Sequence, residues 1–370
     1  MTQAELQLQE ALAAYSFPAP MAGTVRYGCG HINDTFCVLT QPKEGDCIRY
    51  ILQRLSTAAF PHPEQVMENM VSVTGYLRRE IAAAGGDPAR ETLTVLPTRE
   101  GKPYFRDSQG QVWRLMPYIE GTDCLQSADT PELFEASALA FGRFQRMLRD
   151  YPAQTLHETI PRFHDTENRF SKFQAALAAD PMGRAASVQR EVDFVLARQA
   201  DCGVALAAQR RGELPLRVTH NDTKLNNVLF DRKTGRALCV IDLDTVMPGL
   251  SINDFGDSIR FGANHSAEDE QDLSKVNFDL SLYEVYTRGF LAGAGGALTQ
   301  AELHYLPWGA RLMTLECGIR FLTDYLEGDH YFHTQRPGQN LDRCRTQFKL
   351  VADMEGQFGR MEAIVARYAG

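Results

Sequence analysis

The chain has 370 residues, 44% of them hydrophobic and 23% charged, which is ordinary for a globular protein with room for two lobes and excludes a disordered or fibrous chain. Its formal net charge of -9, with no run of lysine or arginine, argues against nucleic acid or an anionic membrane as a partner. A polar start, no long apolar run and eight scattered cysteines without a C-x-x-C pair predict a cytoplasmic protein with reduced thiols.

Strand patterns dominate the first third of the sequence. Apolar or alternating runs between turn residues predict strands at 24–27, 35–39, 48–52, 93–95, 103–105 and 111–116. One helix is predicted at 63–84, because Pro63 stands at its start and two glycines follow its end. These segments indicate a small antiparallel sheet in a first lobe over residues 1–117.

The pattern from residue 118 onward is mainly helical. Helices are predicted at 131–149, 167–178 and 187–211, and again from about 269 to the end. The fold class is therefore α+β, with a small sheet-rich lobe followed by a larger helical lobe over residues 118–370.

The helical pattern is interrupted by the segment with the strongest chemical signal. His220, Asp222 and Asn227 form H-x-D-x-x-x-x-N, and Asp242 follows. Short strands are predicted at 228–230 and 237–241, joined by the turn-forming residues 231–236. If this hairpin closes at Thr234-Gly235, residue 228 pairs with 241, and Asn227 faces Asp242 at about 5 Å.

An amide oxygen and a carboxylate at that separation can share one Mg2+, which would bridge the phosphates of ATP. We therefore expect Asn227 and Asp242 to hold the metal. Asp222 remains free of the metal and can act as the catalytic base that orients the attacking hydroxyl. His220 is expected to brace the backbone of the loop. The pattern predicts a kinase, with a protein-kinase-like arrangement of the two lobes.

The nucleotide is expected between the lobes. The turn at 28–34 contains Gly28, Gly30, His31 and Asn33 and lies between two strands, which argues against a dinucleotide-binding turn and favours a hairpin lid over the phosphates. The segment 116–121 is the expected hinge, where Met116 and Tyr118 would contact adenine. A G-x-x-x-x-G-K-[ST] loop is absent from the sequence.

These motifs resemble the aminoglycoside phosphotransferase and choline kinase family, whose loop carries the same His, Asp and Asn and whose following Ile-Asp supplies the second metal ligand. Protein kinases would also need an A-P-E segment, which is absent from the sequence. Asp254-Phe255-Gly256 imitates their metal motif but lies further along the chain than Asp242. Asp254 is therefore expected to cap a helix or brace a loop.

Within that family the likeness is greatest to bacterial N-acetylhexosamine 1-kinases, and it extends over nearly the full length. The similar runs are 52–55, 63–69, 219–231, 240–249, 253–264 and 316–321. The resemblance implies phosphorylation of the anomeric hydroxyl of GlcNAc and GalNAc, with the preference between the two left open. It also implies a sugar pocket lined by Asp222, Thr245, Phe261, Arg320 and Tyr331. Core packing is the alternative reading for Phe261 and Tyr331.

The sequence departs from the family at the strand 50–52, where a lysine commonly contacts the ATP phosphates. Gln53 and Arg54 follow this strand, so either Arg54 takes the role or Gln53 makes a neutral contact. Glu68 on the next helix could pair with Arg54, as the Lys-Glu pair does in kinases, or could be a solvated surface charge.

Two other hypotheses compete with a sugar kinase. The same chemistry could act on another acceptor, namely another sugar, an amino alcohol or an aminoglycoside. Alternatively, the chain could be a nucleotide-sensing or scaffold protein without turnover, which the intact Asp222, Asn227 and Asp242 disfavour. The number of Mg2+ ions and the oligomeric state stay open.

Overall fold

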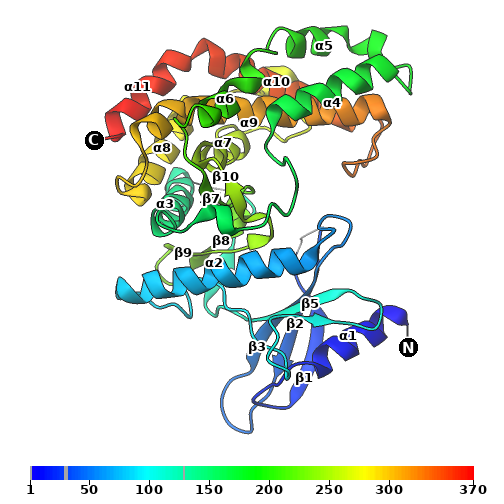
Figure 1. Ribbon diagram of the computed structural model, residues 1–370, viewed down its shortest axis with the longest axis vertical. Helices are drawn as coiled ribbons and strands as arrows, with labels where there is room; N and C mark the ends of the chain where they lie inside the picture. Colours follow the sequence, from blue (N-terminus) through cyan, green and yellow to red (C-terminus); the bar gives the residue numbers. More distant parts are fainter. Residues whose placement is uncertain (1, 29–31, 128–129) are drawn as a thin grey trace.

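The computed structural model describes residues 2–28, 32–127 and 130–370, which form a small lobe and a larger helical lobe (Figure 1). The helices and strands of the small lobe are α1 (Gln3–Ala13), β1 (Met21–Arg26), β2 (Asp34–Thr40), β3 (Ile48–Arg54), α2 (Pro63–Ala83), β4 (Phe105–Arg106) and β5 (Val112–Pro117). Among the described residues these strands form one antiparallel sheet in the order β1-β2-β3-β5-β4. The predicted small antiparallel sheet is confirmed.

The two faces of this sheet have different neighbours. Residues of α1 pack with Leu52 of β3 and Trp113 of β5 in one buried cluster. Because side chains alternate along a strand, Arg54 shares the face of Leu52, whereas Gln53 points to the opposite face. Arg114, which pairs with Gln53 across the strands, lies on that opposite face as well. The sheet therefore presents Gln53 and Arg114 away from α1.

Helix α2 lies between the sheet and the helical lobe (Figure 1). It begins at Pro63, which fits the first turn because its missing N–H has no helical partner, and Gly85 follows its end at φ +75°. Its apolar face, including Met70 and Leu77, packs in one cluster with Phe144 of the larger lobe. The two lobes thus share buried apolar surface.

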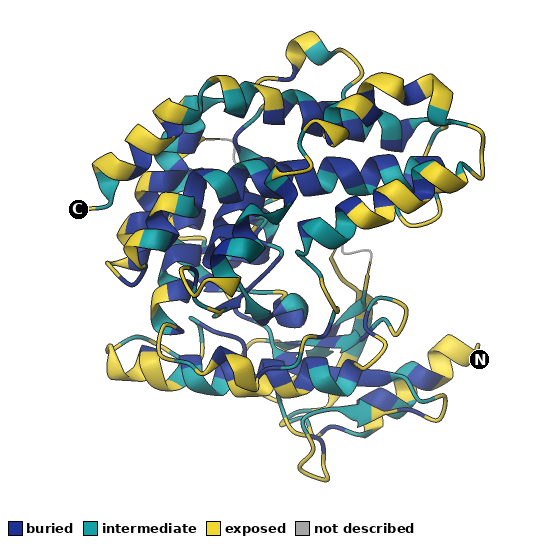
Figure 2. Ribbon diagram, turned by 45° about the horizontal axis from the view of Figure 1, so that its top comes forward, coloured by how far each residue is buried: buried dark blue, intermediate teal, exposed yellow. Residues whose placement is uncertain are grey.

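The larger lobe is built mainly from helices. Its elements are β6 (Thr122–Cys124), α3 (Pro131–Met147), α4 (Thr166–Ala179), α5 (Gln189–Leu196), α6 (Val204–Arg210), β7 (Arg217–Thr219), β8 (Val228–Asp231), β9 (Ala237–Val240), β10 (Met247–Gly249), α7 (Ser251–Gly262), α8 (Leu280–Ala294), α9 (Gln300–Glu327), α10 (Gln339–Gly356) and α11 (Phe358–Tyr368). Short 3-10 helices span Ala153–Thr155, Ala185–Val188, Asp201–Gly203, Leu225–Asn227, Leu243–Thr245 and Leu273–Lys275. Buried residues concentrate where these helices face one another (Figure 2).

Glycines bring α7 and α9 close together. A Cβ on Gly256 of α7 would lie 2.2 Å from the carbonyl oxygen of Gly309 on α9, and a Cβ on Gly309 would lie 2.2 Å from that of Ile252. Only glycine permits this approach of the two backbones. The contact fixes α7 against the longest helix of the described chain.

Three predicted elements of the chain were wrong. Residues 93–95 form no strand, and only Leu96 bridges to β5. The predicted helix at 187–211 is broken between α5 and α6, where Gly203 lies so close to α4 that a Cβ would be 2.7 Å from Glu167 Oε1. The last helical region begins at α8 rather than near residue 269. None of the described helices is both long and apolar enough to span a membrane.

Candidate active site

The loop after β7 is held by carboxylates on α7. Asp254 accepts hydrogen bonds from the backbone N–H of His220 at 2.9 Å and of Asn221 at 2.8 Å. Asp257 accepts the N–H of Thr223 at 3.1 Å. Burial raises the pKa of Asp254, which the two N–H bonds counteract. Asp254 therefore braces the loop, as one of its two predicted roles required.

His220 also braces this loop, as predicted. Its Nε2 lies 2.8 Å from the carbonyl oxygen of Ile241, and its Nδ1 accepts the backbone N–H of Asp222 at 3.3 Å. These contacts suit an imidazole with its proton on Nε2. Because both ring nitrogens are engaged and the residue is fully buried, His220 holds the loop rather than moving a proton.

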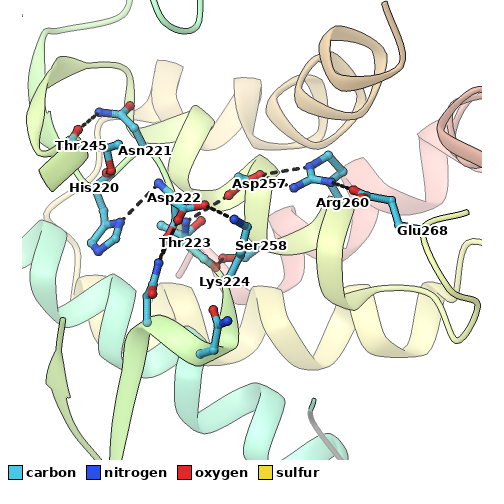
Figure 3. Close-up of polar contacts among 12 residues, drawn as sticks. His220, Asn221, Asp222, Thr223, Lys224, Thr245, Asp257, Ser258, Arg260 and Glu268 are labelled. Atoms are coloured by element: carbon cyan, nitrogen blue, oxygen red, sulfur yellow. Dashed lines mark hydrogen bonds and ion pairs between the residues drawn. The ribbon is translucent and has the colours of Figure 1, made fainter. Parts of the chain in front are cut away.

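Asp222 lies where the loop turns toward β8, and two side chains hold it. Lys224 Nζ is 2.7 Å from Asp222 Oδ1, and Asn227 Nδ2 is 3.1 Å from Oδ2 and 2.8 Å from the Asp222 carbonyl oxygen. Figure 3 shows Lys224 beside Asp222, with Asp257 and Arg260 continuing the polar contacts. Sequence reasoning missed Lys224, although it stands two residues after Asp222 in the motif.

Two carboxylates favour the charged form of Lys224. Burial opposes its ionisation, but Asp222 and Asp257 raise the pKa of Lys224. Burial likewise opposes the charge on Asp257, whereas Arg260 and Lys224 lower the pKa of that carboxyl. A lysine that keeps its charge next to Asp222 holds that carboxylate in place through their ion pair.

The predicted register of the hairpin is wrong by one residue. Val228 pairs with Val240 rather than with Ile241, and the register shifts between Leu229 and Phe230 through a bulge. The N–H of Ile241 donates to the carbonyl of Asn227 at 2.9 Å, so Ile241 is the residue opposite Asn227. The difference arises in the turn, which closes with Asp231 opposite Arg236 and displaces the register by two residues from the predicted pairing; the bulge then recovers one of them.

Asp242 nevertheless belongs to the same centre. It follows β9 in the left-handed conformation, at φ 59° and ψ 56°, where an Asp side chain is tolerated. Burial, together with the charges of Asp244 and Asp222, raises the pKa of Asp242 to about 6. Asp222 contacts Asn227, and Asp242 directly follows Ile241, whose N–H donates to the carbonyl of Asn227. The hairpin therefore places Asp242 one residue beyond the position opposite Asn227.

The donor set fits a magnesium ion. Both hydrogen bonds that the Asn227 side chain makes to described residues use its amide nitrogen, which leaves its oxygen for a metal. The raised pKa of Asp242 marks negative charge that a divalent cation would neutralise. Within the described chain no three His, Cys, Asp or Glu side chains are grouped to hold a metal alone. Phosphate and water oxygens would have to complete the shell, as is usual for Mg2+.

The structure describes only some of the residues that are expected to bind the nucleotide. Gly28 has φ +80° and open space around its Cα, whereas Gly30 and His31 lie outside the described residues. Asn33 spans two elements: its Nδ2 donates to Asp244 at 2.6 Å, and its oxygen accepts the N–H of Ser56 at 3.0 Å. Asn33 thus ties the turn after β1 to the larger lobe.

Gln53 and Arg54 have different surroundings. Arg54 forms an ion pair with Asp34 on the α1 face of the sheet. Gln53 Oε1 accepts hydrogen bonds from Arg114 at 2.9 and 2.7 Å on the opposite face. Glu68 contacts His157 at 2.6 Å instead, so the suggested pair of Glu68 with Arg54 is absent among the described contacts.

Arg114 is a cation that sequence reasoning missed. It is 1% exposed and forms an ion pair with Asp244, which is 3% exposed and lies two residues after Asp242. The same guanidinium binds Gln53, so it joins β3, β5 and the larger lobe. The positive charge facing the site from the sheet is therefore on β5, one strand away from the expected lysine position.

The hinge residues are engaged with β3 and with Tyr27, which follows β1. Met116 pairs with Ile51 in the sheet, and the N–H of Tyr118 donates to the carbonyl of Arg49 at 3.1 Å. The Arg49 guanidinium carbon lies 3.9 Å from the centre of the Tyr118 ring, and the Tyr118 hydroxyl is 3.0 Å from that of Tyr27. The backbone N–H of Tyr118 is therefore already paired, which leaves its carbonyl oxygen and its side chain for any contact with a nucleotide.

The predicted acceptor residues fall into two groups. Thr245 Oγ1 donates to the carbonyl of His220 at 2.6 Å, so it lies against the catalytic loop. Arg320 lies 3.5 Å from the hydroxyl of Tyr331. Tyr331 is 71% exposed and Phe261 is 40% exposed, which rules out core packing for both rings. Both rings are accessible from solvent, and the Tyr331 ring also contacts Phe332.

Comparison with known proteins identifies a family and several similar structures. A model described as the phosphotransferase enzyme family matches residues 24–288. The chain is similar in structure to an aminoglycoside phosphotransferase from Alicyclobacillus acidocaldarius, with 14% identity, a TM-score of 0.62 and coverage of 97% of this chain and 96% of that chain.

Two further solved structures resemble the chain. One is a microcompartment-associated aminopropanol kinase, with 15% identity, a TM-score of 0.54 and coverage of 96% and 98%. The other is an amicoumacin kinase in complex with AMP-PNP and Ca2+, with 15% identity, a TM-score of 0.55 and coverage of 99% and 94%. These likenesses confirm the kinase-like two-lobed fold.

Proposed function

The chain belongs to the phosphotransferase enzyme family, whose members transfer phosphate to hydroxyl groups of small molecules, and from this premise we propose its donor and acceptor. The donor is ATP, and the acceptor is the anomeric hydroxyl of an N-acetylhexosamine, GlcNAc or GalNAc. The observation that carries the proposal is the carboxylate of Asp222, held by Lys224 and Asn227 beside the negative charge at Asp242.

In the proposed reaction the hydroxyl oxygen of the acceptor bonds to the γ-phosphorus as the bond to the β,γ-bridging oxygen breaks. The hydroxyl proton passes to Asp222, and ADP leaves with the bridging oxygen. Because the transition state is loose, the main task of Asp222 is to orient the hydroxyl. Lys224 holds Asp222 in an ion pair and lies where it can also offset charge on the transferring group.

Asn227 and Asp242 are the residues that would hold Mg2+. When bound, the ion neutralises charge on the ATP phosphates. Asp222 then keeps its ion pair with Lys224 and accepts the proton of the acceptor. Arg114 holds Asp244 in place, and Asp244 is one of the charges that act on Asp242.

An N-acetylhexosamine acceptor is supported by the resemblance and by the chemistry of the acceptor residues. The exposed rings of Phe261 and Tyr331 can pack on the C–H face of a sugar. Arg320 is a hydrogen-bond donor only and suits the hydroxyl and acetamido oxygens. A cationic amino alcohol or aminoglycoside, the alternative acceptor, would meet this positive charge rather than the acidic or aromatic cage it needs.

A coupled assay of ADP release with ATP and a panel of acceptors tests the proposal. The panel is GlcNAc, GalNAc, glucose, choline and kanamycin. We expect turnover with GlcNAc or GalNAc to exceed that with every other acceptor, and the product to carry phosphate on O1 by phosphorus NMR. Highest turnover on choline or kanamycin would contradict the sugar assignment. Binding of ATP without any phosphorylated product would support the scaffold hypothesis instead.

A further inference from the structure

Two arginines beside the catalytic loop have donors that the protein leaves unused. Arg169 on α4 donates from Nη2 to the carbonyl of Phe163 at 2.8 Å, while its Nε is buried without a hydrogen-bond partner among the described atoms. Arg320 on α9 reaches the Tyr331 hydroxyl only at 3.5 Å, which is too long for a strong bond. Neither arginine has an ion pair with a carboxylate in the described chain.

The carboxylate nearest to both arginines already has other partners. Glu316 lies one turn before Arg320 on α9 and is 1% exposed. Its Oε1 is 3.0 Å from His164 Nδ1, and its Oε2 accepts the Thr166 hydroxyl at 2.8 Å. Although burial opposes its ionisation, the bond from His164 and the charges of Arg320 and Arg169 lower the pKa of Glu316. Glu316 thus offsets the positive charge without occupying the guanidinium donors.

The arginine pair lies next to the catalytic residues. His164, which binds Glu316 through one nitrogen, has its other nitrogen 3.3 Å from the carbonyl oxygen of Asn221. Asn221 immediately precedes Asp222. The Arg320 guanidinium carbon is 5.8 Å from the centre of the Phe163 ring, whose backbone carbonyl binds Arg169. Both arginines are therefore grouped around one aromatic residue beside the loop that holds Asp222.

Placing two guanidinium groups together costs free energy unless an oxygen satisfies them. Burial and the charge of Arg320 lower the pKa of Arg169. A guanidinium presents its donors in a planar fork that matches the paired oxygens of a carboxylate or phosphate, and a single N–H of the fork can also donate to a carbonyl oxygen. The same charges repel an ammonium group. The pair therefore fits an acceptor with an acyl, carboxylate or phosphate oxygen near the reacting hydroxyl, and of these only the acyl oxygen belongs to the proposed N-acetylhexosamine.

We propose that Arg169 and Arg320 together bind the acyl oxygen of an N-acylated amino sugar, and that Arg169 sets the selectivity for acylated over unsubstituted acceptors. This inference rests on the proposed function and deepens it, because it assigns a residue of α4 to the acetamido group. Arg169 is an acceptor-binding residue, since the reacting hydroxyl remains with Asp222.

The test compares GlcNAc with glucose, which lacks the acyl group, in wild type and in Arg169→Met. We expect kcat/KM for GlcNAc to fall by roughly 10- to 100-fold, mainly through KM, because a charge-assisted hydrogen bond is lost. The value for glucose should change little. Arg169→Lys keeps the positive charge but lacks the planar guanidinium, so it should lose part of the preference for GlcNAc over glucose. This variant serves as the test if Arg169→Met does not fold. Lys172→Met, an exposed charge on the same helix, should behave as wild type.

The outcomes separate this inference from the proposed function. If wild type uses GlcNAc and the Arg169 variants keep its preference over glucose, the assignment of Arg169 is wrong and the proposed function stands. An equal loss on both acceptors would also overturn the assignment, because it would point to a structural role. If wild type does not phosphorylate GlcNAc or GalNAc at all, the proposed function fails, and the acyl-binding role fails with it.

Discussion

At the scale of single residues, the centre brings three carboxylates together, and of these only Asp222 and Asp244 have ion-pair partners among the described residues. Asp242 is close enough to Asp244 and Asp222 for both charges to raise its pKa, while Arg114 and His220 act in the opposite direction. A site that awaits a cation is expected to be destabilised without it. The cost of holding these carboxylates together should therefore appear in the stability of the metal-free protein.

Asp242→Asn should stabilise the metal-free protein while weakening its use of magnesium. The pKa of about 6 lies above that of an unfolded aspartate, so ionisation of Asp242 lowers the stability of the fold as pH rises from about 4 to 6. Thermal unfolding in EDTA should show a higher Tm for the variant at pH 8, by a few degrees, and a smaller difference at pH 5. An equal Tm at pH 8 would contradict the raised pKa.

The residues of the site differ in how far sequence alone could reveal them. Asp222 and Asn227 lie in one short loop, so their spacing in the chain reports their spacing in space. Lys224 lies in the same loop, but no sequence pattern indicated that its side chain contacts Asp222. Arg114 and Asp244 could not be found, because their ion pair joins segments far apart in the chain.

At the scale of elements, α7 positions the catalytic loop through its carboxylates, and α9 positions α7. The closest approach of these helices is at Gly256 and Gly309. Because Asp254 and Asp257 lie on either side of Gly256 in sequence, a shift of α7 would move both bonds to the loop.

Gly256→Ala should lower both stability and kcat. Its Cβ would meet the backbone of Gly309 at 2.2 Å, so α7 must move, at a cost of about 1–3 kcal/mol for overpacking. Urea unfolding and steady-state kinetics check this. Gly75→Ala in α2 is the matched control, since nothing lies within 4 Å of its added Cβ, and it should stabilise the protein. A normal kcat in a destabilised Gly256→Ala variant would contradict the positioning role of α7, because the packing would then affect stability alone.

The loop after α9 is another positioning element. Asp324 is 3% exposed and accepts the backbone N–H groups of His330 at 2.9 Å, Tyr331 at 2.8 Å and Phe332 at 2.9 Å. One carboxylate therefore fixes the backbone of Tyr331 next to Arg320.

Asp324→Asn should raise KM for the acceptor several-fold with a smaller change in kcat. The amide has one acceptor oxygen where the carboxylate has two, so the loop loses hydrogen bonds that hold Tyr331. Steady-state kinetics with varied acceptor measure the effect, and Asp272→Asn, on an exposed turn, is the control. An unchanged KM would contradict the placement of Tyr331 in the acceptor site.

Periodicity predicted the sheet, α2 and α3 well, because their apolar patterns and terminal residues are local signals. It failed where tertiary contacts decide the structure. The turn and the bulge of the β8–β9 hairpin together shift the register by one residue, and the approach of Gly203 to α4 interrupts a helical pattern. Helix α7 escaped detection, so the bracing by Asp257 was missed, although Asp254 was expected to cap a helix or brace a loop.

At the scale of the whole molecule, the lobes are joined by more than the hinge. The face of α2 shares a buried cluster with the helical lobe, and Asn69 of α2 donates to the carbonyl oxygens of His157 at 2.8 Å and Val246 at 3.0 Å. The buried ion pair of Arg114 with Asp244 adds a second link. These contacts indicate that the lobes unfold together.

Arg114→Met should destabilise the protein by about 3–5 kcal/mol, because it leaves the buried charge of Asp244 without its partner. The double variant Arg114→Met/Asp244→Asn should recover part of this loss. Chemical denaturation followed by circular dichroism measures both. Arg232→Met, which breaks the exposed pair with Asp123, should have little effect. A similar loss in the single and double variants would contradict the ion-pair account.

The central claim is that one centre divides its work between a metal-free base, Asp222, and two metal ligands, Asn227 and Asp242. The most direct measurement is a magnesium titration of turnover with saturating ATP and GlcNAc for Asp222→Asn, Asn227→Ala and Asp242→Asn. We predict that Asp222→Asn lowers kcat by about 1000-fold or more without changing the half-saturating Mg2+ concentration, whereas the other two variants raise that concentration. Near-normal kcat in Asp222→Asn, or no change in magnesium dependence for the other two, would contradict the account.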